Sequence, residues 1–377
     1  MAMERLFELM RDKQASDMFF GMNSAIHLKI NGNLVPINNQ RMDQANILSL
    51  LSEVISADEM AVLHRDNELN LGISAPGIGR FRLSAFRQRG TISAVFRFVP
   101  GNIPMLSSLH LPPILPELIM EKRGLILVVG ATGSGKSTTI ASMLDHRNTL
   151  RTGHILTIED PIEFLFRSKK SIVNQREIGT DSASLAIALK NSLRQAPDCI
   201  LIGEIRDAET MSAAIAYAQT GHLVLATLHA NNSYQALNRI ISFFPATHHP
   251  ALLLDLATSI RAIISQRLIR AINGGRHPAV EVLLNTRHIA DLIQSGNISE
   301  LKEAIEKSLS PGSQTFEHAL MQMIHAGLIT QEEGLAHADS STNLLWLLNN
   351  TENKQQPAEI IKPDTEESSF TEFTLNI

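Results

Sequence analysis

The chain begins with a region in which apolar and polar residues alternate with the period of a β-strand. Over residues 80–86, Phe81, Leu83 and Ala85 fall on one face, and two arginines and a serine fall on the other. A strand with one buried and one exposed face has this pattern, because successive side chains point to opposite sides. Residues 91–99 have a similar composition, so we expect them to pair with this strand.

Turn and cap signals accompany these strands. The apolar runs 27–30 and 34–37 flank the tripeptide Asn-Gly-Asn, which is typical of a tight β-hairpin. Ser56 and Glu59 have the spacing of a capping box at the start of a short helix. Together these patterns predict a small α/β domain over residues 1–100.

The pattern changes in the middle of the chain. Four prolines within residues 101–116 predict a linker. Over residues 117–285, short apolar runs alternate with segments of helical period, which indicates a mostly parallel sheet covered by helices. The expected strands are 125–129, 155–158, 199–202 and 223–227, and the expected helices include 137–150, 182–194 and 208–219.

The last hundred residues divide into a hairpin, helices and a tail. Glycines near residues 273–275 predict a late hairpin, and residues 286–350 have helical patterns with a second capping box at Thr330 and Glu333. Residues 351–377 contain few apolar side chains, six acidic residues and two lysines. Such a segment cannot bury enough surface to offset the entropy of ordering, so we predict a disordered acidic tail.

Composition narrows the class of protein. The chain has 377 residues, of which 44% are hydrophobic, and a net charge of -5, which is ordinary for a globular protein of about two domains. This charge does not indicate a basic surface for nucleic acid, and we expect no such partner. The one cysteine, Cys199, lies in an apolar run and is expected to be a buried core thiol. Neither a signal peptide nor an apolar run of about 18 residues is evident, so we expect a cytoplasmic protein.

The strongest chemical signal is a glycine-rich loop. Residues 130–137, Gly-Ala-Thr-Gly-Ser-Gly-Lys-Ser, match the phosphate-binding pattern G-x-x-x-x-G-K-[ST] in full. Its glycines let backbone N–H groups surround phosphate oxygens, Lys136 supplies a positive charge, and the Ser137 hydroxyl reaches Mg²⁺. We therefore expect ATP and Mg²⁺ as cofactors. The expected nucleotide-binding residues are Gly130, Thr132, Gly133, Ser134, Gly135, Lys136, Ser137 and Thr138.

Two acidic segments follow expected strands and therefore lie at the carboxyl edge of the sheet, where ligands bind in open α/β folds. The three carboxylates within residues 157–163 either meet a Mg²⁺-bound γ-phosphate or only cap a helix and solvate a loop. Residues 200–207 form an apolar strand that ends in Glu204, where an aspartate usually binds the Mg²⁺ water shell. We expect Ser137 and Glu204 to be the metal-binding residues.

His222 and His229 stand at the two ends of the expected strand 223–227. Their separation does not place two ligands on one helical turn, so metal binding is not expected. Polar residues at strand ends are usually satisfied by local partners. Beside a nucleotide, these histidines have a second interpretation, which is that they sense the γ-phosphate or a neighbouring subunit.

In this order, the four motifs resemble those of the secretion and type IV pilus ATPases, over residues 1–345. They correspond to that family's Walker A motif (130–137), Asp box (157–163), Walker B motif (203–204) and His box (220–229). Ala-Ser-Asp-Met at residues 15–18 resembles the family's N-terminal Ala-Ser-Asp-Leu motif. The resemblance implies an α/β fold with a PAS-like N-terminal domain, a RecA-like P-loop ATPase domain and added C-terminal helices.

The resemblance also implies roles for individual residues. Glu163 is the expected general base, Glu204 acts at Mg²⁺, and the two histidines link the nucleotide to the moving domains. Arg82 and Arg97 are expected to reach a nucleotide from the N-terminal domain, across the subunit boundary. Such arginines change the rate by roughly 10³–10⁵. The alternative for both arginines is an exposed position on a solvated strand face.

Within the family, the short N-terminal domain and the lack of a tetracysteine motif resemble the retraction ATPases of the PilT and PilU type. Residues 286–293 lack most of the C-terminal helix motif of PilT-like members, whereas residues 193–198 and the acidic tail resemble the PilU-like branch. The resemblance implies a homo-hexamer that assists a PilT-like ATPase in pilus retraction and twitching motility. It also implies a peripheral place at the inner face of the inner membrane, in contact with a pilus platform protein.

Two other functions fit part of the sequence. A nucleotide-gated binding module, which modulates a PilT ring with little hydrolysis of its own, is favoured by the altered C-terminal helix and disfavoured by the intact Glu163 and Glu204. A DNA-translocating RecA-like hexamer fits the fold, but it fits neither the net charge nor the Asp and His boxes.

Overall fold

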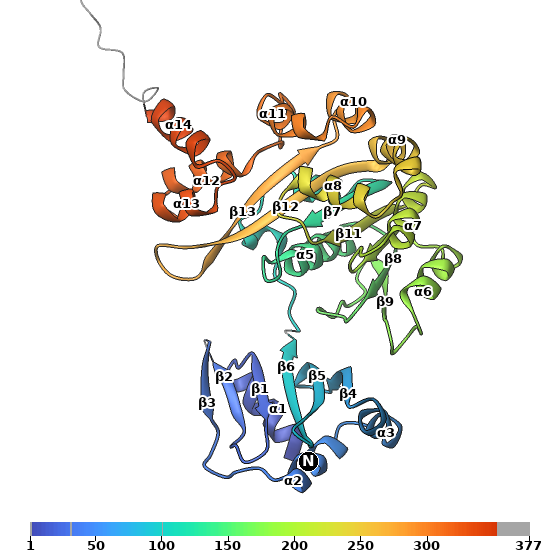
Figure 1. Ribbon diagram of the computed structural model, residues 1–377, viewed down its shortest axis with the longest axis vertical. Helices are drawn as coiled ribbons and strands as arrows, with labels where there is room; N and C mark the ends of the chain where they lie inside the picture. Colours follow the sequence, from blue (N-terminus) through green and yellow to red (C-terminus); the bar gives the residue numbers. More distant parts are fainter. Residues whose placement is uncertain (1, 31, 100, 353–377) are drawn as a thin grey trace, which may run out of the picture.

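The computed structural model describes residues 2–30, 32–99 and 101–352 of the chain. These residues form two sheets, each with its own helices, and a further group of helices at the C-terminal end (Figure 1). We call the part up to Val99 the N-terminal domain and the part built on the second sheet the C-terminal α/β domain. This arrangement confirms the predicted α/β class, with an N-terminal domain and a RecA-like domain.

The N-terminal domain is an antiparallel sheet packed against three helices. Alternation along β5 buries Phe81, which stacks on Phe7 with ring centroids 3.8 Å apart, and leaves Arg80 and Arg82 on the other face. The predicted hairpin and the capping box at Ser56 are both confirmed. In sheet order the strands are β3 (Asn33–Pro36), β2 (His27–Ile30), β1 (Asp17–Phe20), β6 (Thr91–Val99), β5 (Gly79–Gln88) and β4 (Glu68–Ala75). The helices are α1 (Ala2–Asp12), α2 (Gln44–Ser52) and α3 (Ala57–Asp66).

The C-terminal α/β domain has a sheet in which all neighbouring strands are parallel except the last pair, β12 and β13. In sheet order the strands are β13 (Arg276–Leu284), β12 (Ile260–Arg270), β7 (Gly124–Val129), β11 (Leu223–Leu228), β10 (Cys199–Ile202), β8 (Gly153–Glu159) and β9 (Ser171–Glu177). One apolar cluster packs α6 (Leu185–Ser192), α7 (Ala208–Gln219), α8 (Ser233–Ser242) and α9 (His249–Ser259) on the sheet. A second packs α4 (Leu115–Ile119) and α5 (Lys136–Leu150) on the sheet.

In this domain, the structure confirms some local expectations and corrects others. The predicted helix 182–194 is shorter, because Ser184 caps α6 and a 3₁₀ turn at Leu193–Gln195 follows it. The sequence pattern does not predict β9, whose residues are mostly polar and whose Ile172 is exposed. The predicted late hairpin is confirmed and joins β12 to β13. Cys199 is fully buried as predicted, and this burial raises the pKa of its thiol to about 12.

The segment predicted as a linker, residues 101–116, is partly packed. The Ser142 hydroxyl of α5 donates to the Pro104 carbonyl at 2.8 Å. Leu106, in a 3₁₀ turn at Leu106–Leu109, and Leu115 are buried in the cluster that contains α5. The described part of the predicted linker is therefore packed against the α/β domain from Pro104 onward.

The chain beyond β13 is helical. Its helices are α10 (Arg287–Ser295), α11 (Leu301–Glu306), α12 (Phe316–His325), α13 (Gln331–His337) and α14 (Ser341–Glu352). Thr330 caps α13 by accepting from the Glu333 N–H at 3.2 Å, but the Glu333 carboxylate contacts His337 at 3.6 Å instead of completing the predicted capping box. α14 ends two residues into the predicted acidic tail, and residues 353–377 lie outside the described residues.

Candidate functional site

The glycine-rich loop joins β7, whose six residues are all buried, to the start of α5. Gly130 has a φ of +154°, and a Cβ there would lie 2.5 Å from the Gln266 carbonyl, so only glycine fits. The Lys136 ammonium donates to the carbonyls of Gly130 and Ala131 at 2.8 and 2.9 Å. Burial lowers the pKa of Lys136, against the opposing charges of nearby acidic groups. The loop therefore holds a preformed cation at the N-terminal end of a helix, which suits a phosphate.

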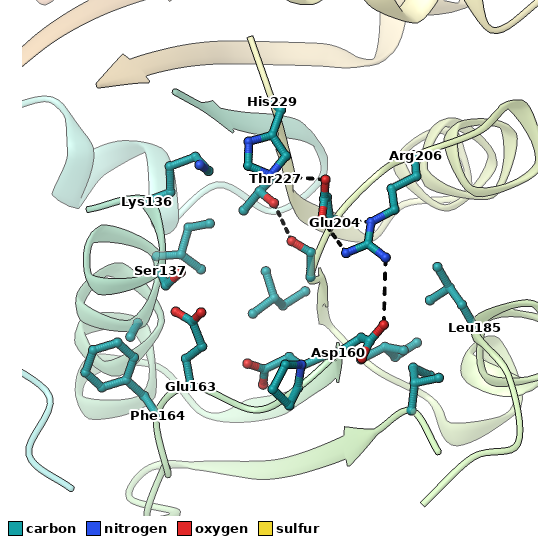
Figure 2. A pocket seen from close by; sticks show the side chains of 18 of the residues that line it. Lys136, Ser137, Asp160, Glu163, Phe164, Leu185, Glu204, Arg206, Thr227 and His229 are labelled. Carbon is teal, nitrogen blue, oxygen red and sulfur yellow. Dashed lines mark hydrogen bonds and ion pairs between the residues drawn. The ribbon is translucent and has the colours of Figure 1, made fainter. Parts of the chain in front are cut away.

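This loop forms one side of a cavity of about 540 Å³ (Figure 2). The other sides come from the ends of three parallel strands, β8, β10 and β11, and from β5 of the N-terminal domain. The expected site residues that line it are Arg82, Thr132, Gly133, Lys136, Ser137, Glu163, Glu204 and His229. The fold thus brings together most of the predicted site, from both domains.

Glu204, at the end of β10, already has two partners in the cavity. One carboxylate oxygen is 2.7 Å from the guanidinium of Arg206, and the other is 3.2 Å from the His229 imidazole. The Arg206 guanidinium also lies 3.8 Å from Asp160. The hydrogen bond to Glu204 raises the pKa of Arg206. Glu204 is therefore held at the cavity wall by a cation, as the dashed lines in Figure 2 show.

The Asp box contributes two glutamates in different surroundings. Glu159 accepts from the Thr157 hydroxyl at 2.6 Å and from the Gln175 amide at 3.2 Å. Burial raises the pKa of Glu159. Glu163 is exposed, and Figure 2 shows its carboxylate directed into the cavity on the side of Ser137. Of the two, Glu163 is the one placed to accept a proton from a water molecule in the cavity.

The donor set suits Mg²⁺ bound mainly by phosphates. Among the described residues, no group of three or more His, Cys, Asp or Glu side chains is placed to hold a metal ion without other ligands. Mg²⁺ is usually bound through one or two protein groups, several waters and substrate phosphates. Ser137 and Glu204 both line the cavity and provide the hard oxygen ligands that Mg²⁺ prefers.

The N-terminal arginines have three different surroundings. Arg82 lines the cavity that its own chain forms, although the family resemblance implies action across a subunit boundary. Arg97 pairs with Asp17 at 2.7 Å and is not among the residues that line the cavity. Arg80, two residues before Arg82, pairs with Glu177 of β9. The structure therefore places Arg82, and not Arg97, beside the loop of the same chain.

The two histidines lie at opposite ends of β11, a central strand of the sheet. His229 follows β11 and faces Glu204 in the cavity. His222 precedes β11, and its ring lies 3.2 Å from the Tyr217 carbonyl and from the Thr220 hydroxyl. His222 has the satisfied strand-end surroundings that were the simpler interpretation of its sequence position.

A second cavity, of about 300 Å³, lies on the other side of the glycine-rich loop. Gly130 and Ser134 line it, and the Ser134 hydroxyl is buried with no hydrogen-bond partner in the protein. Gly135 caps α5 with a left-handed backbone, and Thr138 follows in the first turn of the helix. Thr132 and Gly133 line both cavities, so the loop separates them.

The chain is similar to known proteins over most of its length. Residues 2–276 match the family described as Type II/IV secretion system protein. The chain belongs to this family. The type IV pilus ATPase PilU of Pseudomonas aeruginosa is 47% identical over 92% of this chain and 91% of PilU. The type IV pilus retraction ATPase PilT of the same organism is 36% identical over 87% of this chain and 96% of PilT.

A solved structure agrees with this assignment. The crystal structure of the pilus retraction motor PilT with bound ADP has a TM-score of 0.85 and 37% identity, and covers 90% of this chain and 99% of that chain. The protein is therefore an ATP-hydrolysing, nucleotide-binding member of the PilT/PilU group, as the motifs predict. Within the described residues, none of the helices has both the length and the apolar character needed to cross a bilayer.

The sequence motifs of this ATPase do not identify every residue at the site. Arg206 stands two residues after the Walker B glutamate, Glu204. That short spacing could have identified it as the partner of Glu204. Glu177 and Gln175, by contrast, lie on the unpredicted strand β9, and the fold brings them into contact with Ile162 and Glu159 of the Asp box. No pattern within β9 signals this contact.

Proposed function

We propose that this chain is a subunit of a homo-hexameric motor that hydrolyses ATP to drive or assist type IV pilus retraction, in the PilU-like manner that depends on a PilT-like ATPase. The observation that carries the proposal is the shared cavity, in which Lys136, Glu163 and Glu204 of one domain meet Arg82 of the other. The higher identity to PilU than to PilT supports the PilU-like assignment.

The chemistry follows from the lining of the cavity. The loop N–H groups and Lys136 bind the phosphates of ATP. Mg²⁺ bound by Ser137 and Glu204 supplies neutralising charge. Glu163 accepts a proton from the attacking water, a contribution of roughly 10²–10⁴-fold for a positioned base. Arg206 and His229 keep the Glu204 carboxylate oriented.

Arg82 adds a contribution from the N-terminal domain. It reaches the cavity from a domain that joins the α/β domain through a short connection, so its position depends on the angle between the domains. We propose that ATP favours the arrangement in which Arg82 faces the phosphates, and that release of products allows the domains to separate. Repeated around a ring, this movement provides mechanical work.

The proposed partners follow from the same assignment. They are further copies of this chain, a PilT-like ATPase and an inner-membrane pilus platform protein, which the ring contacts from the cytoplasmic side as a peripheral protein. Nucleic acid is not proposed as a partner, because the net charge of -5 gives no support for binding a polyanion.

Single-turnover and steady-state ATP hydrolysis by the purified protein test the proposal. We expect Lys136→Ala to abolish hydrolysis, because the glycine-rich loop then lacks the ammonium group that faces the β- and γ-phosphates. We expect Glu163→Gln to retain ATP affinity while kcat falls by roughly 10²–10⁴-fold. The matched control is Glu209→Gln, which changes an exposed glutamate of α7 outside the cavity.

The outcomes separate the candidate functions. ATP binding without single-turnover hydrolysis in the wild-type protein, with or without a PilT-like ATPase, would favour a nucleotide-gated binding module. Equal loss of affinity and kcat in Glu163→Gln would mean that Glu163 is structural.

A further inference from the structure

The carboxylate of Glu177 joins the two domains. It lies at the end of β9, its side chain is 3% exposed, and it pairs with the guanidinium of Arg80 from β5. The same oxygen, Oε2, accepts a hydrogen bond from the backbone N–H of Ile162 at 3.0 Å. One buried carboxylate therefore holds a cation from the N-terminal domain and a backbone group of the Asp box.

Ile162 directly precedes Glu163, so this contact bears on the proposed base. A second residue of β9 acts alongside Glu177: the Gln175 amide donates to the Phe164 carbonyl and accepts from the Phe166 N–H, both at 2.8 Å. Residues two apart on a strand lie on one face. The segment from Ile162 to Phe166 is thus attached on both sides of Glu163 to a single face of β9.

Arg80 and Arg82 repeat this relation on β5. They also lie two residues apart on one face, and while Arg80 meets Glu177, Arg82 lines the nucleotide cavity. One face of β5 therefore contacts the α/β domain at Glu177 and also contributes to the nucleotide cavity.

We propose that Arg80 and Glu177 form an interdomain latch whose closure positions Arg82 and the Glu163 segment together. The proposal rests on the proposed function, in which Glu163 is the base. Arg80 and Glu177 are positioning residues. Withdrawal of the N-terminal domain breaks this largely buried ion pair and at the same time takes Arg82 out of the cavity. Hydrolysis is thereby restricted to the closed arrangement of the domains.

Gly72 of β4 provides a way to open the latch without removing a charge. A Cβ at this position would overlap the Arg80 guanidinium and lie 2.9 Å from Oε1 of Glu177. Gly72→Ala should therefore separate the ion pair. Arg80→Ala removes it directly, and Arg80→Lys keeps a positive charge. Arg87→Ala is the matched control, because it removes an exposed arginine from the same strand outside the cavity.

The first measurement compares kcat with ATP affinity in the full-length protein. We expect Arg80→Ala and Gly72→Ala to lower kcat by about 10- to 100-fold, because small displacements of catalytic groups have effects of that size. ATP affinity should stay at the wild-type value, Arg80→Lys should recover part of kcat, and Arg87→Ala should match wild type. Latch variants that match Arg87→Ala in kcat overturn the proposal, and so does a loss of affinity that accounts for the whole effect.

The second measurement does not depend on hydrolysis. Spin labels at Glu68→Cys in β4 and Ile172→Cys in β9, both exposed positions, report the distance between the domains, while Cys199 is buried and stays unlabelled. We expect longer or broader distances in both latch variants than in wild type. Unchanged distances overturn the latch. Full activity of Glu163→Gln instead overturns the proposed base, and the distance measurement still decides whether Arg80 and Glu177 hold the domains together.

Discussion

The two ends of the chain are attached to the nucleotide-binding domain in physically different ways. At the C-terminal end, a buried apolar cluster combines Ile269 of β12 and Ala279 of β13 with residues of α12 and α14. At the N-terminal end, the apolar cluster contains residues of the N-terminal domain alone, within the ranges that the structure describes. The join we find between those domains is polar, through Arg80 and Glu177.

Polar contacts reinforce the C-terminal attachment. The Arg267 guanidinium lies 3.9 Å from the centre of the Phe316 ring and also pairs with Asp339. Asp339 accepts from the Asn232 amide, at the start of α8, at 2.8 Å. Breaking this attachment exposes a hydrophobic core, whereas breaking the N-terminal one separates the Arg80–Glu177 ion pair. We therefore expect α12–α14 to move with the hairpin β12–β13, and the N-terminal domain to hinge only when the Arg80–Glu177 pair opens.

The largest expected effect concerns the stability that the C-terminal helices contribute. Phe316 is fully buried, and Phe316→Ala should lower the free energy of unfolding by about 3–5 kcal/mol. Urea unfolding followed by circular dichroism measures this loss. Leu309→Ala is the control, since Leu309 is 98% exposed and should cost little. A small loss for Phe316→Ala would show that these helices are attached as loosely as the N-terminal domain.

The next effect concerns the N-terminal side. Arg82→Ala should lower kcat on the order of 10²-fold, a typical cost of losing one group that stabilises developing charge, without lowering stability. Because Arg82 lines the cavity of its own chain, we expect no regain of hydrolysis when Arg82→Ala subunits are mixed with Lys136→Ala subunits. Recovery in mixed rings, with mixing confirmed by native mass spectrometry, would instead support an arginine acting across the subunit boundary.

Many features of the fold and of the candidate site were predictable from local sequence. Alternation identified β5, and the loop motif with its flanking strand and helix located Lys136 and Ser137. These features depend on residues close together in the chain, where side-chain periodicity and backbone requirements act directly. The same holds for Glu204, which ends an apolar strand.

The remaining features depend on contacts between distant segments. Arg80 and Glu177 are 97 residues apart, and Glu177 ends a polar edge strand that has no apolar run to reveal it. The sequence likewise grouped His222 with His229, although only His229 follows its strand and so lies at the carboxyl edge where ligands bind in open α/β folds. The parallel pairing of β10 and β11 then brings His229 to within 3.2 Å of Glu204 at the cavity.

The smallest expected effect is a pH dependence of the free energy of unfolding that arises at Glu281, on the C-terminal side. Glu281 of β13 is 3% exposed and accepts from the Ser233 N–H at 2.8 Å and from the Ser265 hydroxyl at 3.0 Å. Burial raises the pKa of Glu281 above its ordinary value, the two serines oppose this shift, and the charge of Asp339 adds to it. The folded protein therefore binds this proton more tightly than the unfolded chain does.

It follows that the stability contributed by Glu281 is fully present below the pKa of the unfolded chain and is lost as the pH rises through the raised pKa of the folded protein. Glu281→Gln keeps an acceptor for both serines but cannot ionise. Relative to wild type, this variant should therefore become more stable as the pH rises through that range. Urea unfolding of both proteins across a pH series measures the difference, with the exposed Glu332→Gln as control. A difference that stays constant with pH would mean that Glu281 is ionised at no cost in the fold, and that the C-terminal attachment tolerates a buried charge as readily as the N-terminal latch does.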